Sequence, residues 1–187
     1  LLKISIFKGE FMKIFRFILI VIGIFIFLLF AIPFFLPNQA YSEREIVINQ
    51  PIDSVYYYLL DLENFKDWNP WTDMEKDLVL SVTNNNRDVG SKIEWEGDSL
   101  GSGYLERIEL QQNKLLKSKI VFIKPWKSEA NDIMHFEKIS ENSTKVRWGM
   151  QMELDYPFGR YFNFFYDDMV GKDHEKGLAK IKELLEK

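Results

Sequence analysis

The stretch VINQPIDSVYYYLLDLENFKDWNPW, residues 47–71, contains the change of pattern that decides the fold. Its first residues complete an alternating segment, SEREIVI, which predicts a strand, and Pro51 then suits the first turn of a helix. Apolar residues recur at three- and four-residue intervals over 52–62, which predicts a helix with one apolar face. A second helical piece over 63–68 ends before Pro70, because a residue preceding proline is pushed out of the helical region.

Beyond this stretch the apolar residues change to a period of two, which is typical of strands with one buried face. Turns rich in Gly, Asn and Ser separate the alternating segments. The last segment is the clearest, because Val146, Trp148, Met150 and Met152 alternate with polar residues. The pattern predicts six further strands, over 78–84, 91–98, 102–110, 114–123, 127–139 and 144–154.

The final segment, 160–187, is the long helical candidate that can cover the apolar face of this sheet. Apolar residues form a stripe along it and charged residues fill the other side. Gly171 and Gly177 lie inside the predicted helix, where glycine costs about 1 kcal/mol relative to alanine. We therefore expect a close approach, a bend or open space at these two positions.

A segment of different composition precedes the domain, since residues 17–36 form a run of 20 residues without a charge. As a helix rising about 1.5 Å per residue, the run would span roughly 30 Å, the hydrocarbon thickness of a bilayer. A buried core helix would show a polar face, and a cleaved signal would be shorter and followed by small residues. We expect an uncleaved single-pass transmembrane anchor over 12–37, with 1–11 as an upstream extension.

Basic residues flank this run asymmetrically. Lys3, Lys8, Lys13 and Arg16 precede it, whereas Arg44 is the first basic residue after it. The positive-inside rule then places the amino terminus in the cytoplasm and the soluble domain outside.

The charge and composition of the soluble part exclude several functions. Residues after position 36 carry a formal charge of −7, because the whole chain carries −4 and the first 36 residues carry +3. An acidic domain without a Lys/Arg cluster argues against nucleic acid as a partner. The chain has no cysteine, which excludes disulfides and thiolate chemistry.

The order of predicted elements, with the stretch 47–71, IEWEGDSLGSGYLERIE at 93–109 and VRWGMQM at 146–152, resembles the START-like superfamily, also called SRPBCC or Bet v 1-like. Within it, the chain is most similar to polyketide cyclase/dehydrase members associated with lipid transport. The resemblance covers Ser42 to the C-terminus and contains no catalytic fingerprint. It implies an α+β helix-grip domain over 38–187, with a seven-stranded antiparallel sheet wrapped around the C-terminal helix and an apolar cavity between them.

Large rings and methionines are the candidates for the wall of that cavity. Trp68 and Trp71 flank an Asn-Pro step where the short helices meet the sheet, and each suits either the core or the cavity wall. Flat rings and flexible thioethers can line a pocket for varied apolar ligands, or fill it completely. The predicted ligand-binding residues are Trp68, Trp71, Trp95, Tyr104, Phe122, Trp126, Met134, Phe136, Trp148, Met150, Phe165 and Met169.

Glu106 is the one candidate for catalysis. If Tyr104, Ile108 and Leu110 face inward, alternation brings Glu106 inward too, where an apolar pocket would suit a general acid or base. A bulge that turns it outward, or an ion pair with Arg107 or a lysine, is the alternative that we favour, because charged residues are rarely buried unpaired.

The two histidines do not predict a metal site. His135 lies on a strand and His174 on the last helix, without the ligand spacing of a zinc centre. We expect His174 at the helix surface or the cavity rim. No nucleotide fingerprint occurs either, so the sequence predicts neither a metal nor another cofactor.

Three functions remain open at this point. The first is a membrane-tethered module that binds an apolar small molecule or lipid. The second is an enzyme of the cyclase or dehydratase kind that uses Glu106 or a loop carboxylate. The third is a tethered interaction domain with a filled core, whose protein partner the sequence does not identify.

Overall fold

The computed structural model describes residues 2–75, 77–83 and 86–187 of the chain. These residues divide into two compact units. One contains the N-terminal segment up to Asn38 together with Leu154–Phe162, and the other contains Gln39–Glu153 together with Asn163–Lys187. The predicted boundaries at 12 and 38 stay predictions.

The first unit contains one long apolar helix, α1 (Leu2–Phe35). Its portion Phe11–Phe35 is long and apolar enough to cross a membrane, a property that signal sequences share. The predicted run 17–36 lies almost entirely within it.

Two side chains of the 154–162 segment donate hydrogen bonds to carbonyl groups at the end of α1. Pro33 has no N–H for the carbonyl of Leu29, and Pro37 has none for that of Pro33. Tyr161 Oη donates to the Leu29 carbonyl at 3.2 Å, and Arg160 Nη1 donates to the Pro33 carbonyl at 2.9 Å. Side chains thus supply donors that the prolines lack, as helix ends require.

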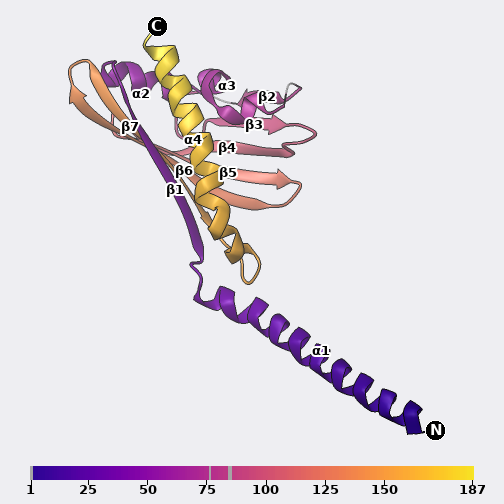
Figure 1. Ribbon diagram of the computed structural model, residues 1–187. Coiled ribbons are helices and arrows are strands. Elements are labelled where there is room, and N and C mark those ends of the chain that lie inside the picture. Colours follow the sequence, from indigo (N-terminus) through magenta and orange to yellow (C-terminus); the bar gives the residue numbers. More distant parts are fainter. Residues whose placement is uncertain (1, 76, 84–85) are drawn as a thin grey trace. The chain divides into compact units, whose positions relative to one another are not determined.

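The second unit is built on a seven-stranded antiparallel sheet with the strand order β1-β7-β6-β5-β4-β3-β2 (Figure 1). Its edge strand β1 precedes the short helices, and the other six strands follow one another as hairpins. The strands are β1 (Gln39–Ile48), β2 (Val79–Thr83), β3 (Lys92–Glu96), β4 (Ser102–Gln111), β5 (Leu115–Lys124), β6 (Ser128–Ser140) and β7 (Ser143–Glu153).

Helices lie between β1 and β2 and after β7. They are α2 (Ile52–Leu60), the 3-10 turn η1 (Leu62–Asn64), α3 (Phe65–Trp68), the 3-10 turn η2 (Pro70–Asp73), η3 (Gly159–Phe162) and α4 (Asn163–Leu185). The predicted α+β helix-grip fold is confirmed, with its long C-terminal helix and short helices after the first strand. Most strand boundaries differ from the predicted ones by one to two residues, and position 84, the predicted end of one strand, lies outside the described residues.

The long helix α4 covers only part of the sheet. It packs chiefly on β1 and β7, while α2 packs on β6 and β7. No helix of the described chain makes comparable contact with β2 to β5. The inner face of the sheet is therefore filled on one side and less covered on the other.

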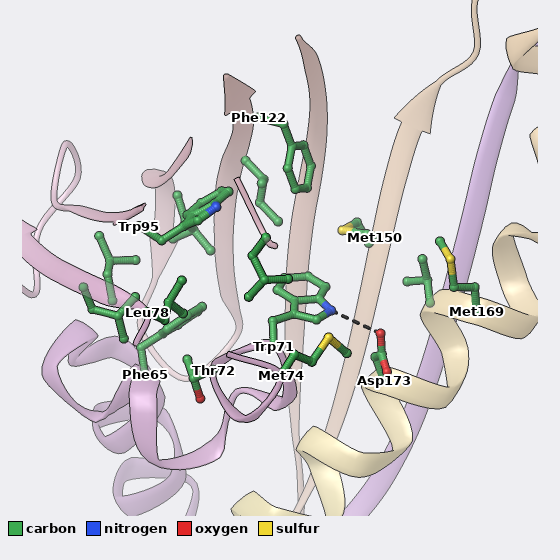
Figure 2. A pocket seen from close by; sticks show the side chains of 16 residues that line it. Phe65, Trp71, Thr72, Met74, Leu78, Trp95, Phe122, Met150, Met169 and Asp173 are labelled. Carbon is green, nitrogen blue, oxygen red and sulfur yellow. Dashed lines mark hydrogen bonds between the residues drawn. The ribbon is translucent and has the colours of Figure 1, made fainter. Parts of the chain in front are cut away.

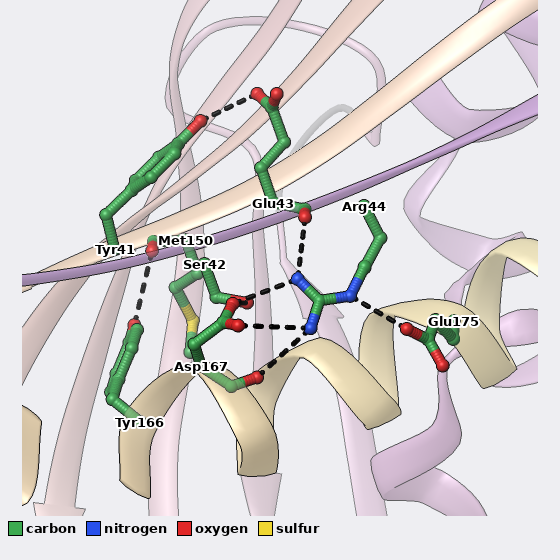
Figure 3. A network of polar contacts seen from close by, with 8 residues as sticks. All are labelled: Tyr41, Ser42, Glu43, Arg44, Met150, Tyr166, Asp167 and Glu175. Atoms are coloured by element: carbon green, nitrogen blue, oxygen red, sulfur yellow. Dashed lines mark hydrogen bonds and ion pairs between the residues drawn. The ribbon is translucent and has the colours of Figure 1, made fainter. Parts of the chain in front are cut away.

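Hydrogen bonds and ion pairs join α4 to the edge strand β1 (Figure 3). Arg44 donates from Nη1 to Asp167 at 2.9 Å and from Nε to Glu175 at 2.8 Å. Ser42 Oγ donates to the same Asp167 carboxylate at 2.8 Å, and these bonds lower the pKa of Asp167 below its ordinary value. The N-terminal half of α4 is thus held on the β1 side.

The two glycines of α4 mark close approaches, as predicted. A Cβ atom at Gly177 would lie 2.5 Å from Cζ3 of Trp148, and one at Gly171 would overlap the guanidinium of Arg44. A side chain at Gly177 would push the helix away from the core ring beneath it.

Candidate functional site

A cavity of about 370 Å³ lies between the sheet, the η2 turn and α4 (Figure 2). Its size falls in the range of small-molecule sites. Its walls are apolar except for Thr72 and Asp173. The lining residues are Phe65, Trp71, Thr72, Met74, Leu78, Leu80, Ile93, Trp95, Leu100, Leu105, Ile120, Phe122, Met150, Met169, Val170 and Asp173.

The floor of the cavity follows from strand alternation. Ile93, Leu105 and Ile120 occupy a cross-strand row on β3, β4 and β5, since Ile93 pairs with Leu105 and Leu105 pairs with Ile120. All three are buried by the protein. Trp95 and Phe122 extend this face, with their ring centroids 5.6 Å apart in an edge-to-face arrangement.

The two tryptophans of the Asn-Pro turn have different roles. Trp68 is buried, packs edge-to-face on Trp148 at 5.3 Å between ring centroids, and does not line the cavity. Trp71 lines the cavity and donates from Nε1 to Asp173 Oδ2 at 3.2 Å. Asn69 fixes the turn, because its side chain accepts a hydrogen bond from the Trp71 N–H at 2.9 Å.

The other predicted ligand-binding residues fall into three groups. Trp95, Phe122, Met150 and Met169 line the cavity with Trp71. Met134, Phe136 and Trp148 are buried like Trp68, but they pack in the filled part of the core and not in the cavity wall. Tyr104, Trp126 and Phe165 do not line the cavity.

These three residues miss the cavity for separate reasons. Tyr104 lies on the outer face of β4, where Lys92 Nζ sits 4.8 Å from its ring centroid. Trp126 lies in the turn between β5 and β6 and is 81% exposed. Phe165, near the start of α4, is 66% exposed and does not reach the cavity.

Glu106 also faces outward, so the interior position considered for it is wrong. It forms an ion pair with Lys92, with 3.4 Å between Oε2 and Nζ, as the favoured alternative anticipated. The inward residues of β4 are Leu105 and Arg107. A register shift between Arg107 and Glu109 leaves Ile108 and Glu109 both exposed, so the alternation that buries Leu105 and Arg107 is interrupted after Arg107.

A row of polar residues crosses the inner face beyond the cavity floor. Arg107 pairs in register with Ser118, and Ser118 pairs with Asp132. The fully buried Arg107 guanidinium donates to Ser118 Oγ at 2.9 Å and to the Leu59 carbonyl at 2.6 Å. Burial lowers the pKa of Arg107. This row was not predicted from the sequence. Arg107 lies two residues after Leu105, so the period-two pattern of β4 places both on the same face.

Trp148 stands at the centre of the filled core. Its indole Nε1 donates to Asp132 Oδ1 at 2.5 Å, and its ring stacks on the His174 ring with centroids 4.2 Å apart. Burial raises the pKa of Asp132 to about 6, and the Trp148 hydrogen bond only partly opposes this rise.

His174 is fully buried, so its predicted place at the helix surface or cavity rim is wrong. Neither ring nitrogen meets hydrogen-bond geometry with a described residue. Burial, together with the charge of Arg44, lowers the pKa of His174 to about 4, so the ring is neutral near pH 7. Its acidic neighbours in sequence suggested a wet face, but helix geometry turns the ring onto Trp148.

Asp173 was not predicted as a site residue. It lies four residues after Met169, on the face of α4 that meets the cavity, and this spacing was the available signal. Its side chain is 15% exposed, and Lys176 Nζ lies 3.6 Å from Oδ1.

No family model and no curated protein matches the chain in sequence. Many solved structures share its fold. The aromatase/cyclase Zhui from a Streptomyces strain aligns with a TM-score of 0.61 and 11% identity, over 79% of this chain and 94% of that one.

Two further structures come from structural genomics. A protein from Chromobacterium violaceum aligns with a TM-score of 0.56 and 16% identity, over 81% of this chain and 99% of that one. A protein from Thermobifida fusca aligns with a TM-score of 0.58 and 12% identity, over 78% and 95% of the two chains. At these identities the likeness shows a common fold, the helix-grip α+β domain preceded in this chain by one apolar helix.

Proposed function

We propose that this chain is a membrane-anchored START-like module that binds a hydrophobic small molecule or lipid between the sheet and α4. The observation that carries the proposal is the cavity of about 370 Å³, whose lining is apolar except for two side chains. Burial of apolar surface contributes about 25 cal/mol per Å², so such a ligand needs few directed polar contacts. Shape then does most of the selection.

The membrane part of the proposal rests on α1. Its apolar portion Phe11–Phe35 suits a bilayer span, and the basic residues before it favour a cytoplasmic amino terminus with the domain outside. A reporter fused after Lys187 tests this orientation. Reporter activity restricted to the cytoplasm would overturn it.

A cyclase-like enzyme is the second candidate, because one structural neighbour is an aromatase/cyclase. Glu106 does not serve this candidate, since it lies on the outer face. Among the described lining residues, Asp173 carries the carboxyl group that remains available for acid or base chemistry. The third hypothesis, a filled interaction domain, loses support because the interior contains a hollow.

Lipid extraction and native mass spectrometry of the purified full chain test the binding proposal. We expect an apolar molecule to co-purify with the wild type. Leu105→Phe, which points a larger ring into the cavity, should reduce the bound fraction at least about fivefold. Leu116→Phe is the matched control, because Leu116 is buried on β5 but does not line the cavity.

The proposal fails if the wild type and Leu105→Phe retain the same amount of apolar material. Equal loss in Leu116→Phe would point to general unfolding, which circular dichroism of each variant detects independently.

A further inference from the structure

The hydrogen-bonding groups of the cavity wall allow the ligand class to be narrowed. Of the described side chains that line the cavity, Trp71, Thr72 and Trp95 carry N–H or O–H groups. Trp71 Nε1 already donates to Asp173. The Thr72 hydroxyl lies 2.7 Å from the Asn69 carbonyl and 3.1 Å from the Lys66 carbonyl, and donates to the backbone. Trp95 adds a single uncharged indole N–H, and none of the described lining side chains is cationic.

The wall also offers hydrogen-bond acceptor capacity at Asp173. A carboxylate has about four lone-pair sites. Asp173 receives a hydrogen bond from Trp71 at Oδ2 and faces the exposed Lys176 at 3.6 Å from Oδ1. Figure 2 shows the carboxyl group turned from α4 toward the Trp71 indole, and Met74 and Met169 line the same cavity. A ligand group that donates a hydrogen bond can reach a partner here.

We infer that the cavity selects an apolar molecule with an uncharged hydroxyl head and rejects fatty acids and other anionic amphiphiles. The inference rests on the proposed function and names its ligand class. A hydroxyl group would donate to Asp173 while its chain lies along the apolar wall. A carboxylate or phosphate head would find no cation among the described lining residues and would place a second negative charge beside Asp173, which disfavours both charged forms.

The discrimination should be large enough to measure. A site built to accept a hydrogen bond from a ligand penalises an analogue that leaves its buried polar group unpaired. We expect dodecanol to bind at least about tenfold more tightly than dodecanoate, and at least about threefold more tightly than methyl dodecanoate, which has no donor.

The experiment uses the full chain in lipid nanodiscs, with empty nanodiscs subtracted. Radiolabelled dodecanol is displaced by unlabelled dodecanol, dodecanoate or methyl dodecanoate, at a pH where the acid is ionised. Asp173→Asn keeps an acceptor for Trp71 but removes the negative charge and adds a donor. It should raise the relative affinity for dodecanoate at least about fivefold.

Asp168→Asn is the matched control. It removes the same charge from the same helix, but Asp168 is exposed, pairs with Lys172 at 2.8 Å and does not line the cavity. The alcohol-to-acid ratio should be unchanged in this variant.

The outcomes separate the two proposals. Wild-type binding of dodecanoate as tight as that of dodecanol overturns the ligand class and leaves the binding function standing. A preference for dodecanol that survives in Asp173→Asn overturns the role of Asp173. Failure of all three probes to bind overturns the binding function, and the ligand class with it.

Discussion

The inner face of the sheet is built in two contrasting ways. Under α2 and α4 it is solid, with buried polar groups that include Arg107 and Asp132 on the strands and His174 on α4. Beside the row Ile93–Leu105–Ile120 it is hollow and almost wholly apolar. The two regions meet on β4 and β5, which contribute Leu105 and Ile120 to the hollow and Arg107 and Ser118 to the solid region, so the difference there comes from what covers them.

The comparison shows where this domain tolerates buried charge. Arg107 and Asp132 lie where α2 and Trp148 supply hydrogen-bond partners, in the Leu59 carbonyl and the indole N–H. Of the described helices, none covers the cavity-side strands comparably, and a charge on those strands would be buried without partners whenever a ligand excluded water. Hydrogen-bonded polar groups therefore stabilise the solid region, whereas the apolar residues of the cavity side leave space for a ligand.

The largest effect is expected from removing the buried cation of the solid region. Arg107→Ala should lower the free energy of unfolding by about 3–5 kcal/mol, because it leaves the Leu59 carbonyl and Asp132 without their positive neighbour. Denaturant unfolding followed by tryptophan fluorescence measures this. Arg147→Ala, at a half-exposed arginine that pairs loosely with Glu43 at 4.0 Å, is the control and should cost less than about 1 kcal/mol. Similar losses in the two variants would contradict the distinction.

Opposed pH dependences are expected from Asp132 and His174. The pKa of Asp132 rises from 3.8 to about 6 on folding, so the folded state binds the proton more tightly and stability falls as pH rises from about 4 to 6. The pKa of His174 falls from 6.5 to about 4, so stability rises as pH rises from about 4 to 6.5. A pKa shift of one unit corresponds to about 1.4 kcal/mol, so each residue changes the free energy of unfolding by roughly 3 kcal/mol over this range. In the wild type the two changes have opposite signs and offset each other.

Single variants separate these two contributions. Asp132→Asn should leave the His174 contribution, so its stability relative to wild type increases as pH rises from about 4 to 6. His174→Phe, which keeps a ring on Trp148, should show the reverse slope. Unfolding free energies across this pH range provide the measurement, and parallel profiles for both variants and wild type would refute the assignment.

A smaller change in stability is expected when the same substitution is made in the filled core and at the cavity floor. Leu116→Phe enlarges a side chain in the solid region and should cost about 1–3 kcal/mol through overpacking. Leu105→Phe makes the same change at the cavity floor, where the added atoms have room, and should cost less than about 1 kcal/mol. Thermal unfolding of the two variants gives the comparison, and a reversed order of stability would show that the hollow is occupied by the protein itself.

The smallest effect is expected outside both regions. Glu106→Gln removes an ion pair with Lys92 in which both side chains are about 30% exposed, so stability should change by less than about 1 kcal/mol. Ligand retention should be unchanged, because the residue faces away from the cavity. Loss of ligand in this variant would return Glu106 to consideration as a functional group.

The fold was predictable because its signals are local. The change from three- and four-residue spacing at 52–62 to period two after 78 gave the helices, the strands and their order. The phase of β4 was not predictable, because the bulge at Ile108 placed apolar residues on both faces. The burial of His174 depends on how α4 turns against Trp148, which acidic neighbours in the sequence concealed.

The cavity was only partly predictable for a similar reason. The sequence supplied large rings and methionines, but Trp68 and Trp71 differ only in which side of a turn they occupy. Whether these side chains pack against one another or leave a cavity depends on the position of α4 over β1 and β7. The spacing of apolar residues in the sequence does not encode this position at one side of the sheet. Asp173 escaped notice because one carboxylate on a highly charged helix resembles its solvated neighbours.

The cross-strand row Arg107–Ser118–Asp132 also bears on how faithfully the hairpins assemble. If β4 slipped by one residue against β5, Arg107 would turn to solvent and Glu106 would enter the interior near Asp132. The carboxylates of Glu106 and Asp132 would then both be buried without a cation, and Leu105 would be exposed to solvent. The row Arg107–Ser118–Asp132 thus destabilises shifted registers of β4 against β5. It therefore favours the native strand register during folding.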